Sequence, residues 1–406
     1  MNWLMNETLE LPAQQSAPSP QGSEVPVAIT SASFGKRIRN FAGRVVRWIS
    51  STIEWIFGAI TLIATIAVFS VIPFLNFLTL GYFLEVSGRV ARTKRLRDGF
   101  IGVRKAAVFG RIVFGSWLMF WPVRFVSGMW QDAELIASGS KTAIGWRVAL
   151  FIVMILTVVH VLWACLRGGK LRHFFWPAPC RFYKWLRQDG KFDGVQTRVM
   201  DYLAGLRLGY YFKLGGLGFL GGLIWLFIPV SILVFASKLP EGVAFLVSVF
   251  GGGLLLIVAA YLPFVQAYYA MENRFAAMFE LKRVRHLFRH APVAFWTALF
   301  ITVLFSIPLY LLKIEFPPKE IAWLPSLLFV VFIFPARLLT GWALGRALKR
   351  EQPRHFFFRW VARLGALPVA FFYVFAVYLT QYLSWNGVLS LFEQHAFLVP
   401  APMLSL

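Results

Sequence analysis

Residues 143–166 read AIGWRVALFIVMILTVVHVLWACL, and residues 167–175, which follow directly, read RGGKLRHFF. The first stretch is long and apolar enough for one helix to cross the roughly 30 Å hydrocarbon core of a bilayer. The second opens a basic segment, residues 167–213, with ten Lys and Arg against three Asp. An apolar run that ends in such a cluster is typical of a membrane span whose last residue is cytosolic.

The same alternation of basic and apolar segments continues along the chain. Of the 41 Lys and Arg, 35 fall in five segments: residues 36–47, 89–111, 167–213, 274–289 and 337–363. The other six lie in or beside the short intervening connections. Because positive loops stay inside, this pattern predicts an all-α polytopic integral membrane protein with a cytosolic N-terminus and its C-terminus outside.

Composition supports a membrane protein and argues against a soluble one. The 406-residue chain is 58% hydrophobic and only 15% charged, so a soluble fold would expose large apolar patches to water. Its net charge of +23 lies in loops and helix ends that flank apolar runs. That placement favours contact with the anionic head groups of a lipid bilayer rather than with nucleic acid.

Hydropathy predicts seven spans after an N-terminal tail. Residues 1–33 contain no Lys or Arg and many Pro, Gln and Ser, which predicts a disordered cytosolic tail. Residues 34–406 form the multi-pass membrane domain. The span predicted at residues 108–130 requires the Arg111 side chain to snorkel to the head groups and Arg124 to find a partner. The predicted spans are residues 108–130, 143–166, 214–236, 242–271, 292–312, 321–345 and 365–383.

Upstream of these spans, residues 56–84 are uncharged but have strong positive charge on both sides. Pro73 and Asn76 lie near the centre of this run, where a helix would break. We therefore favour a helical hairpin over residues 51–93, with helices at about 51–70 and 74–93 that enter the membrane and return. The alternative is one tilted, kinked span, which would place residues 36–47 outside.

Two basic segments carry apolar residues at helical spacing. In the cytosolic loop 167–213, Phe182, Trp185 and Leu186 repeat on one side of a short helix and three cations lie on the other. This composition is typical of an interfacial helix in anionic head groups. Residues 273–290 show a similar pattern, which predicts either an interfacial anchor or a coupling helix. In the loop 167–213, the candidate anionic-lipid contacts are Arg181, Lys184 and Arg187.

Ionisable residues at membrane depth are the other candidate functional positions. Arg124 lies roughly 9 Å below the outer end of its span, after a kink expected at Pro122. It either pairs with Asp132 or Glu134, or it contacts an anion or a lipid phosphate. The guanidinium of Arg337, which follows Pro335, is either buried or snorkels.

Two further candidates have simpler interpretations. His160 lies within a span, and the later spans offer no acid for a proton relay, so a hydrogen-bonded core histidine is favoured. Glu85 is four residues before Arg89, and the two are expected to form an ion pair on one helix face. Glycines in residues 215–222 and 251–253 predict close helix packing.

No pattern in the chain indicates catalysis. There is no P-loop, no dinucleotide fingerprint, and no HExxH or GxSxG motif. His286 and His290 share a helix face, but arginines adjoin them and no carboxylate follows. We therefore predict no catalytic residue, no metal site and no cofactor, and lean against an enzyme.

Three groups of residues resemble an uncharacterised family of bacterial polytopic membrane proteins, a domain-of-unknown-function group. The groups are 72–82 (IPFLNFLTLGY) running into 88–92 (GRVAR), 167–169 (RGG) with 176–179 (WPAP), and 268–275 (YYAMENRF). The similarity covers roughly residues 48–312. It implies the bacterial inner (cytoplasmic) membrane, and the family has no known activity that would assign a catalytic residue.

A faint internal repeat is also present. Residues 73–76 (PFLN) resemble residues 263–266 (PFVQ), and each run leads through Tyr to a Glu and then an Arg. This is either a duplicated helix pair, as many transporters have, or a chance match between apolar runs.

Three functional classes follow from these observations. The first is a non-enzymatic membrane protein that organises lipid, or a membrane protein partner complex, through its basic cytosolic face. The alternative is a transporter or channel component, which would need a continuous polar path through the spans. The third is a membrane-embedded lipid enzyme, for which paired acids or a nucleophile constellation are missing.

Overall fold

The computed structural model describes residues 31–72, 74–187, 193–312, 323–383, 387–393 and 395. These residues are helical or in turns. The chain divides into two units, Met1–Thr52 and Ile53–Leu406, which we describe separately. The described part of the smaller unit is the first half of helix α1 (Ser31–Val71). The predicted disordered tail lies outside the described residues, apart from residues 31–33.

Seven helices of the described residues are long and apolar enough to cross a membrane. A further pair, Leu281–His290 and Pro292–Ile307, is bent by 111° and would make an eighth span if it counts as one. The prediction of a polytopic all-α membrane protein is therefore confirmed. The seven are Gly43–Val71, Val103–Ile136, Lys141–Leu166, Gly194–Ala236, Glu241–Glu272, Pro325–Ala347 and Phe356–Tyr382.

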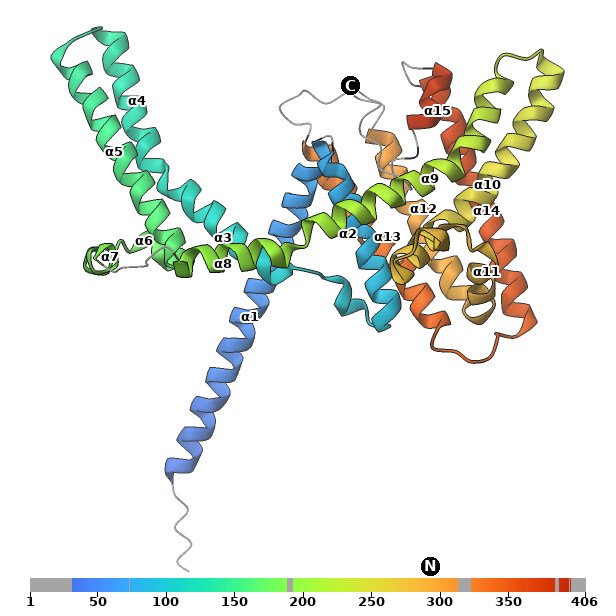
Figure 1. The fold of residues 1–406 in the computed structure, drawn as a ribbon, viewed down its shortest axis with the longest axis horizontal. Helices are drawn as coiled ribbons and strands as arrows, with labels where there is room; N and C mark the ends of the chain where they lie inside the picture. Colours follow the sequence, from blue (N-terminus) through green and yellow to red (C-terminus); the bar gives the residue numbers. More distant parts are fainter. Residues whose placement is uncertain are drawn as a thin grey trace, which may run out of the picture. The chain divides into compact units, whose positions relative to one another are not determined.

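The first predicted span is two helices, α3 (Val103–Met119) and α4 (Trp121–Ile136). They meet at Phe120, just before Pro122, where the sequence predicted a kink. Helix α5 (Lys141–Leu166) begins at Ser140, whose side chain accepts a hydrogen bond from the Ala143 amide as an N-cap. Helices α4 and α5 lie side by side as a hairpin (Figure 1).

The remaining helices follow the predicted order with shifted ends. The basic loop contains three short helices: α6 (Leu171–Phe175), α7 (Pro179–Leu186) and α8 (Asp193–Leu206). The last two described helices are short, the 3₁₀ helix η4 (Gly387–Leu389) and α15 (Ser390–Glu393). The others are α9 (Leu208–Ala236), α10 (Glu241–Glu272), η2 (Phe275–Phe279, 3₁₀), α11 (Leu281–His290), α12 (Pro292–Leu312), α13 (Trp323–Ala347) and α14 (Phe356–Leu383).

Helices α1 and α2 (Leu75–Thr93) break where the hairpin was predicted to turn. Helix α1 ends at Val71. Phe74, directly before α2, has a φ of 65°, a value that a right-handed helix does not adopt, so the helix is interrupted here. Pro73 itself lies outside the described residues. Thirteen of the 19 residues of α2 are buried, so α2 is a core helix, and it contacts α9, α10 and α13.

Glycines allow the backbone of α2 to touch its neighbours. A Cβ atom on Gly215 of α9 would lie 1.8 Å from the Phe77 carbonyl oxygen of α2. One on Gly341 of α13 would lie 2.3 Å from the Ser87 carbonyl oxygen. Only glycine fits at such separations, as in other close helix crossings in membranes. Among the predicted glycines, Gly215 thus packs on α2 and Gly251 packs on α9, whereas Gly216 and Gly253 have no atom within 4 Å of an added Cβ.

The ends of α2 and α10 share one backbone conformation. Lys94 and Asn273, directly after the two helices, are left-handed, with φ of 60° and 56°. An extended arginine follows each of them, and then a 3₁₀ helix, η1 (Leu96–Gly99) or η2. This likeness aligns Lys94 with Asn273, whereas the sequence match aligned Pro73 with Pro263. The two alignments differ, so the faint sequence repeat does not account for the similar ends of α2 and α10.

Candidate functional site

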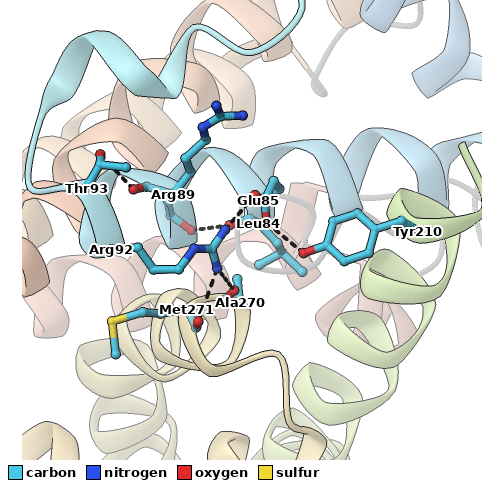
Figure 2. Close-up of polar contacts among 9 residues, drawn as sticks. Leu84, Glu85, Arg89, Arg92, Thr93, Tyr210, Ala270 and Met271 are labelled. Atoms are coloured by element: carbon cyan, nitrogen blue, oxygen red, sulfur yellow. Dashed lines mark hydrogen bonds and ion pairs between the residues drawn. The ribbon is translucent and has the colours of Figure 1, made fainter. Parts of the chain in front are cut away.

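A buried carboxylate on α2 is the centre of a polar network (Figure 2). Glu85 is only 6% exposed. One of its oxygens accepts a hydrogen bond from Nη2 of Arg92 at 2.5 Å, and the other accepts from the Tyr210 hydroxyl at 2.8 Å. The network therefore joins α2 to α9, the helix that carries Tyr210.

The expected pair between Glu85 and Arg89 does not form. Arg89 is exposed and points away from the carboxylate, and the described residues show no ion pair for it (Figure 2). Arg92 lies seven residues after Glu85, which returns it to almost the same helix face. Sequence reasoning missed both Arg92 and Tyr210, although this seven-residue spacing was a usable signal for the first.

Arg92 has a second role at the end of α10. Its Nη1 donates hydrogen bonds to the carbonyl oxygens of Ala270 at 2.7 Å and Met271 at 3.1 Å. The last carbonyls of a helix have no partner within it, and a cation is favoured there by the helix dipole. Arg92 thus neutralises Glu85 and caps α10. Every charge of this network has a partner within the protein, so it holds three helices together.

Arg337 on α13 is the second buried ionisable group. It is 4% exposed, and its Nη1 donates to the side-chain oxygen of Gln266 on α10 at 2.7 Å. The sequence allowed either a buried or a snorkelling guanidinium for Arg337, and in the structure the side chain is buried. Its polar partner is a residue of the faint repeat.

The end of α5 is bound tightly to the segment that follows it. The ring of His160 is hydrogen-bonded to the Phe174 carbonyl, and the indole of Trp163 donates to the Pro177 carbonyl at 2.8 Å. The Arg167 guanidinium donates to the Trp176 carbonyl at 2.6 Å. The half-buried His160 therefore has the hydrogen-bonded structural environment that the sequence favoured.

Helix α7 packs on the end of α5 by its aromatic face. The rings of Phe182 and Trp185 lie 5.1 Å and 5.5 Å from that of Trp163, measured between centroids. The three predicted lipid contacts, Arg181, Lys184 and Arg187, are all exposed. They form no ion pair within the described part of the chain. We call these three residues the α7 cations.

The region beside α7 has a strongly positive potential. The pKa of His173 is lowered, first by burial and then by four neighbouring cations. Positive charge disfavours a protonated imidazole, so the part of this shift that burial does not cause reflects the neighbouring cations. The four cations are Arg167, Arg172, Lys170 and Arg181.

Arg124 is exposed and does not pair with Asp132 or Glu134. Glu134 instead accepts a hydrogen bond from the Ser138 hydroxyl at 2.8 Å. Helix α4 continues to Ile136, and eight to ten residues of helix separate the charges by about 12–15 Å. The expected fold-back of the acids over the helix end is therefore wrong. Arg111, expected to snorkel, forms an ion pair with Glu54 at 2.7 Å.

No protein-family model, no curated protein and no solved structure matches the chain. The resemblance to an uncharacterised bacterial family therefore has no further support. Among the residues that the structure describes, no group of three or more His, Cys, Asp or Glu could hold a metal ion.

Proposed function

We propose that this multi-pass membrane protein is non-enzymatic and organises anionic lipid, or a membrane partner complex, through a basic cytosolic face. The α7 cations carry this proposal. They are exposed beside the end of a candidate span, while the aromatic face of the same helix packs on Trp163. The bacterial inner membrane, which the family resemblance implies, is part of the proposal, and the distribution of Lys and Arg supports a cytosolic position for α7.

The energetics favour lipid as the partner of this face. Each Lys or Arg near an anionic membrane surface contributes about 1 kcal/mol, so the α7 cations together would contribute about 3 kcal/mol. The nearby Arg172 and Lys170 add to the same field, as the lowered pKa of His173 indicates. The aromatic packing holds α7 beside the span, so little ordering is needed when lipid binds.

The test is lipid selectivity in reconstituted vesicles of phosphatidylcholine and phosphatidylglycerol. Electron spin resonance with spin-labelled lipids measures how strongly the protein prefers phosphatidylglycerol. The preference should fall as salt rises, because the screening length shortens from about 10 Å at 0.1 M to about 3 Å at 1 M. Replacing Arg181, Lys184 and Arg187 by Gln should remove much of it.

A charge-conserving variant, Arg181→Lys with Arg187→Lys, is the matched control and should keep the preference for phosphatidylglycerol. If the neutralised triple variant keeps the same preference and the same salt dependence, the α7 cations do not contact lipid and the proposal is wrong.

A further inference from the structure

A groove lies between α10 and the segment formed by η2 and α11. Its volume is about 640 Å³, within the range of small-molecule sites. Its lining has an apolar part, which consists of Ile257 of α10, Phe279 of η2 and Leu281 of α11. The lining also includes three exposed cations of α11, Lys282, Arg283 and Arg285, which we call the α11 cations.

The length of α10 places this groove at a membrane surface. Helix α10 begins at Glu241, and 20 residues at 1.5 Å each reach Tyr261 after about 30 Å, the thickness of the hydrocarbon core. Tyr261 therefore lies at the head-group level opposite the start of α10. Ile257 lies about 6 Å deeper, among the acyl chains. The charge pattern of the chain assigns this level to the cytosolic leaflet.

The apolar side of the groove is open to lipid. Ile257 is 49% exposed and Phe279 is 43% exposed, although both are apolar. Phe279 is held in place by stacking on Trp225, with 6.1 Å between the ring centroids. The groove thus offers a fixed apolar wall just below the head-group level.

Among the residues that the structure describes, the α11 cations have no acidic partner. Arg285 is positioned by Tyr261, whose hydroxyl accepts from its Nε at 3.4 Å and whose ring lies 6.0 Å from the guanidinium. Glu280 also lines the groove, but it accepts from Arg274 at 3.0 Å and from the Tyr268 hydroxyl at 3.3 Å. In the described part of the chain, none of the α11 cations forms an ion pair.

We propose that this groove binds one anionic phospholipid of the cytosolic leaflet. The α11 cations hold its phosphate, and one acyl chain follows Ile257 and Phe279 into the membrane. The inference rests on the proposed function, since it assumes that the basic face meets anionic lipid. It differs from the α7 contact because it is a defined site for a single lipid, with an apolar wall as well as charge.

The experiment is native mass spectrometry of the full chain in detergent, with added phosphatidylglycerol, phosphatidylcholine or inorganic phosphate. The wild type should retain one phosphatidylglycerol in preference to phosphatidylcholine. Replacing the α11 cations by Gln should weaken that retention about tenfold or more, because three charge contacts are lost. Ile257→Trp, which fills the apolar side without changing charge, should also weaken it.

The neutralised α7 variant separates the two proposals. It should lose the diffuse lipid preference in vesicles but keep the single bound phosphatidylglycerol. If it keeps both, the proposed function fails while the groove still stands. Each variant must elute like the wild type on size exclusion. If the variant with neutralised α11 cations misfolds, the retention of phosphatidylglycerol by Ile257→Trp tests the lipid site instead.

Three results would overturn the lipid site. The first is unchanged retention of phosphatidylglycerol when the α11 cations are neutralised. The second is displacement of the lipid by inorganic phosphate at a similar concentration, which would indicate a site for a free anion. The third is unchanged retention in Ile257→Trp, because an acyl chain in the groove could not tolerate the added ring.

Discussion

Helices α2 and α7 both carry arginines, but Arg92 of α2 has partners within the protein, whereas the arginines of α7 are exposed. On α2, Arg92 has Glu85 and two helix-terminal carbonyls as partners, and most of the helix is buried. On α7, no residue is buried, and the α7 cations form no ion pair in the described chain. Charge that has partners within the protein stabilises the fold, whereas exposed and clustered charge is available to contact anions outside the protein. The α7 and α11 cations are of the second kind.

Removing Arg92 should have the largest effect. Arg92→Leu leaves the buried carboxylate of Glu85 without its cation. Breaking a buried pair from one side typically costs about 3–5 kcal/mol, and the loss should fall at the lower end because the Arg92 side chain is 37% exposed, so water can partly replace it. Arg89→Leu, at the exposed neighbouring position, should change the stability by less than about 0.5 kcal/mol. Thermal unfolding of the purified protein in detergent compares the two variants.

A double variant checks the cause of that loss. Glu85→Gln combined with Arg92→Leu removes the stranded charge and should recover part of the lost stability. If Arg92→Leu and Arg89→Leu are equally mild, the pairing on α2 contributes nothing, and the contrast with α7 disappears.

Adding a methyl group to Gly215 should have a smaller but clear effect. Gly215→Ala places a Cβ against the Phe77 carbonyl of α2, and relieving such an overlap costs about 1–3 kcal/mol. Gly216→Ala is the matched control, because no atom lies within 4 Å of its added Cβ. The control should stabilise the helix by roughly 0.5–1 kcal/mol. Equal melting temperatures for the two variants would mean that α2 and α9 do not touch here.

The smallest effect is expected on α4. Replacing Asp132 by Asn and Glu134 by Gln should change stability by less than about 0.5 kcal/mol, since neither acid pairs with Arg124. Arg124→Leu should leave the protein level unchanged or raise it, because an exposed guanidinium is removed from a span. A clear loss on stripping the acids would show that the pair forms in the membrane.

The sequence predicted the features that depend on local composition. Long apolar runs identified six of the seven candidate spans. Gly43–Val71 was expected as part of a hairpin, and the predicted span 292–312 is present only in the bent pair. Pro73 and Pro122 marked breaks, and the segregated faces of α7 followed from its spacing. What it missed depends on which helix ends meet in space. Glu85 could pair with either Arg89 or Arg92 on its own helix. Arg92 is favoured because it also donates to the carbonyls at the C-terminus of α10. The burial of α2 likewise depends on glycines of α9 and α13.

The position of α2 also has a consequence for biogenesis. Arg92 donates to Ala270, which is 178 residues further along the chain. At a translation rate of about 5–20 residues per second, roughly 9–36 s pass before that carbonyl is made. The contacts of α2 with α9 can form before then, because α9 ends at Ala236, whereas those with α13 must wait until residues 323–347 are made. Helix α2 is therefore among the first helices to be synthesised and among the last to be enclosed by its contacts.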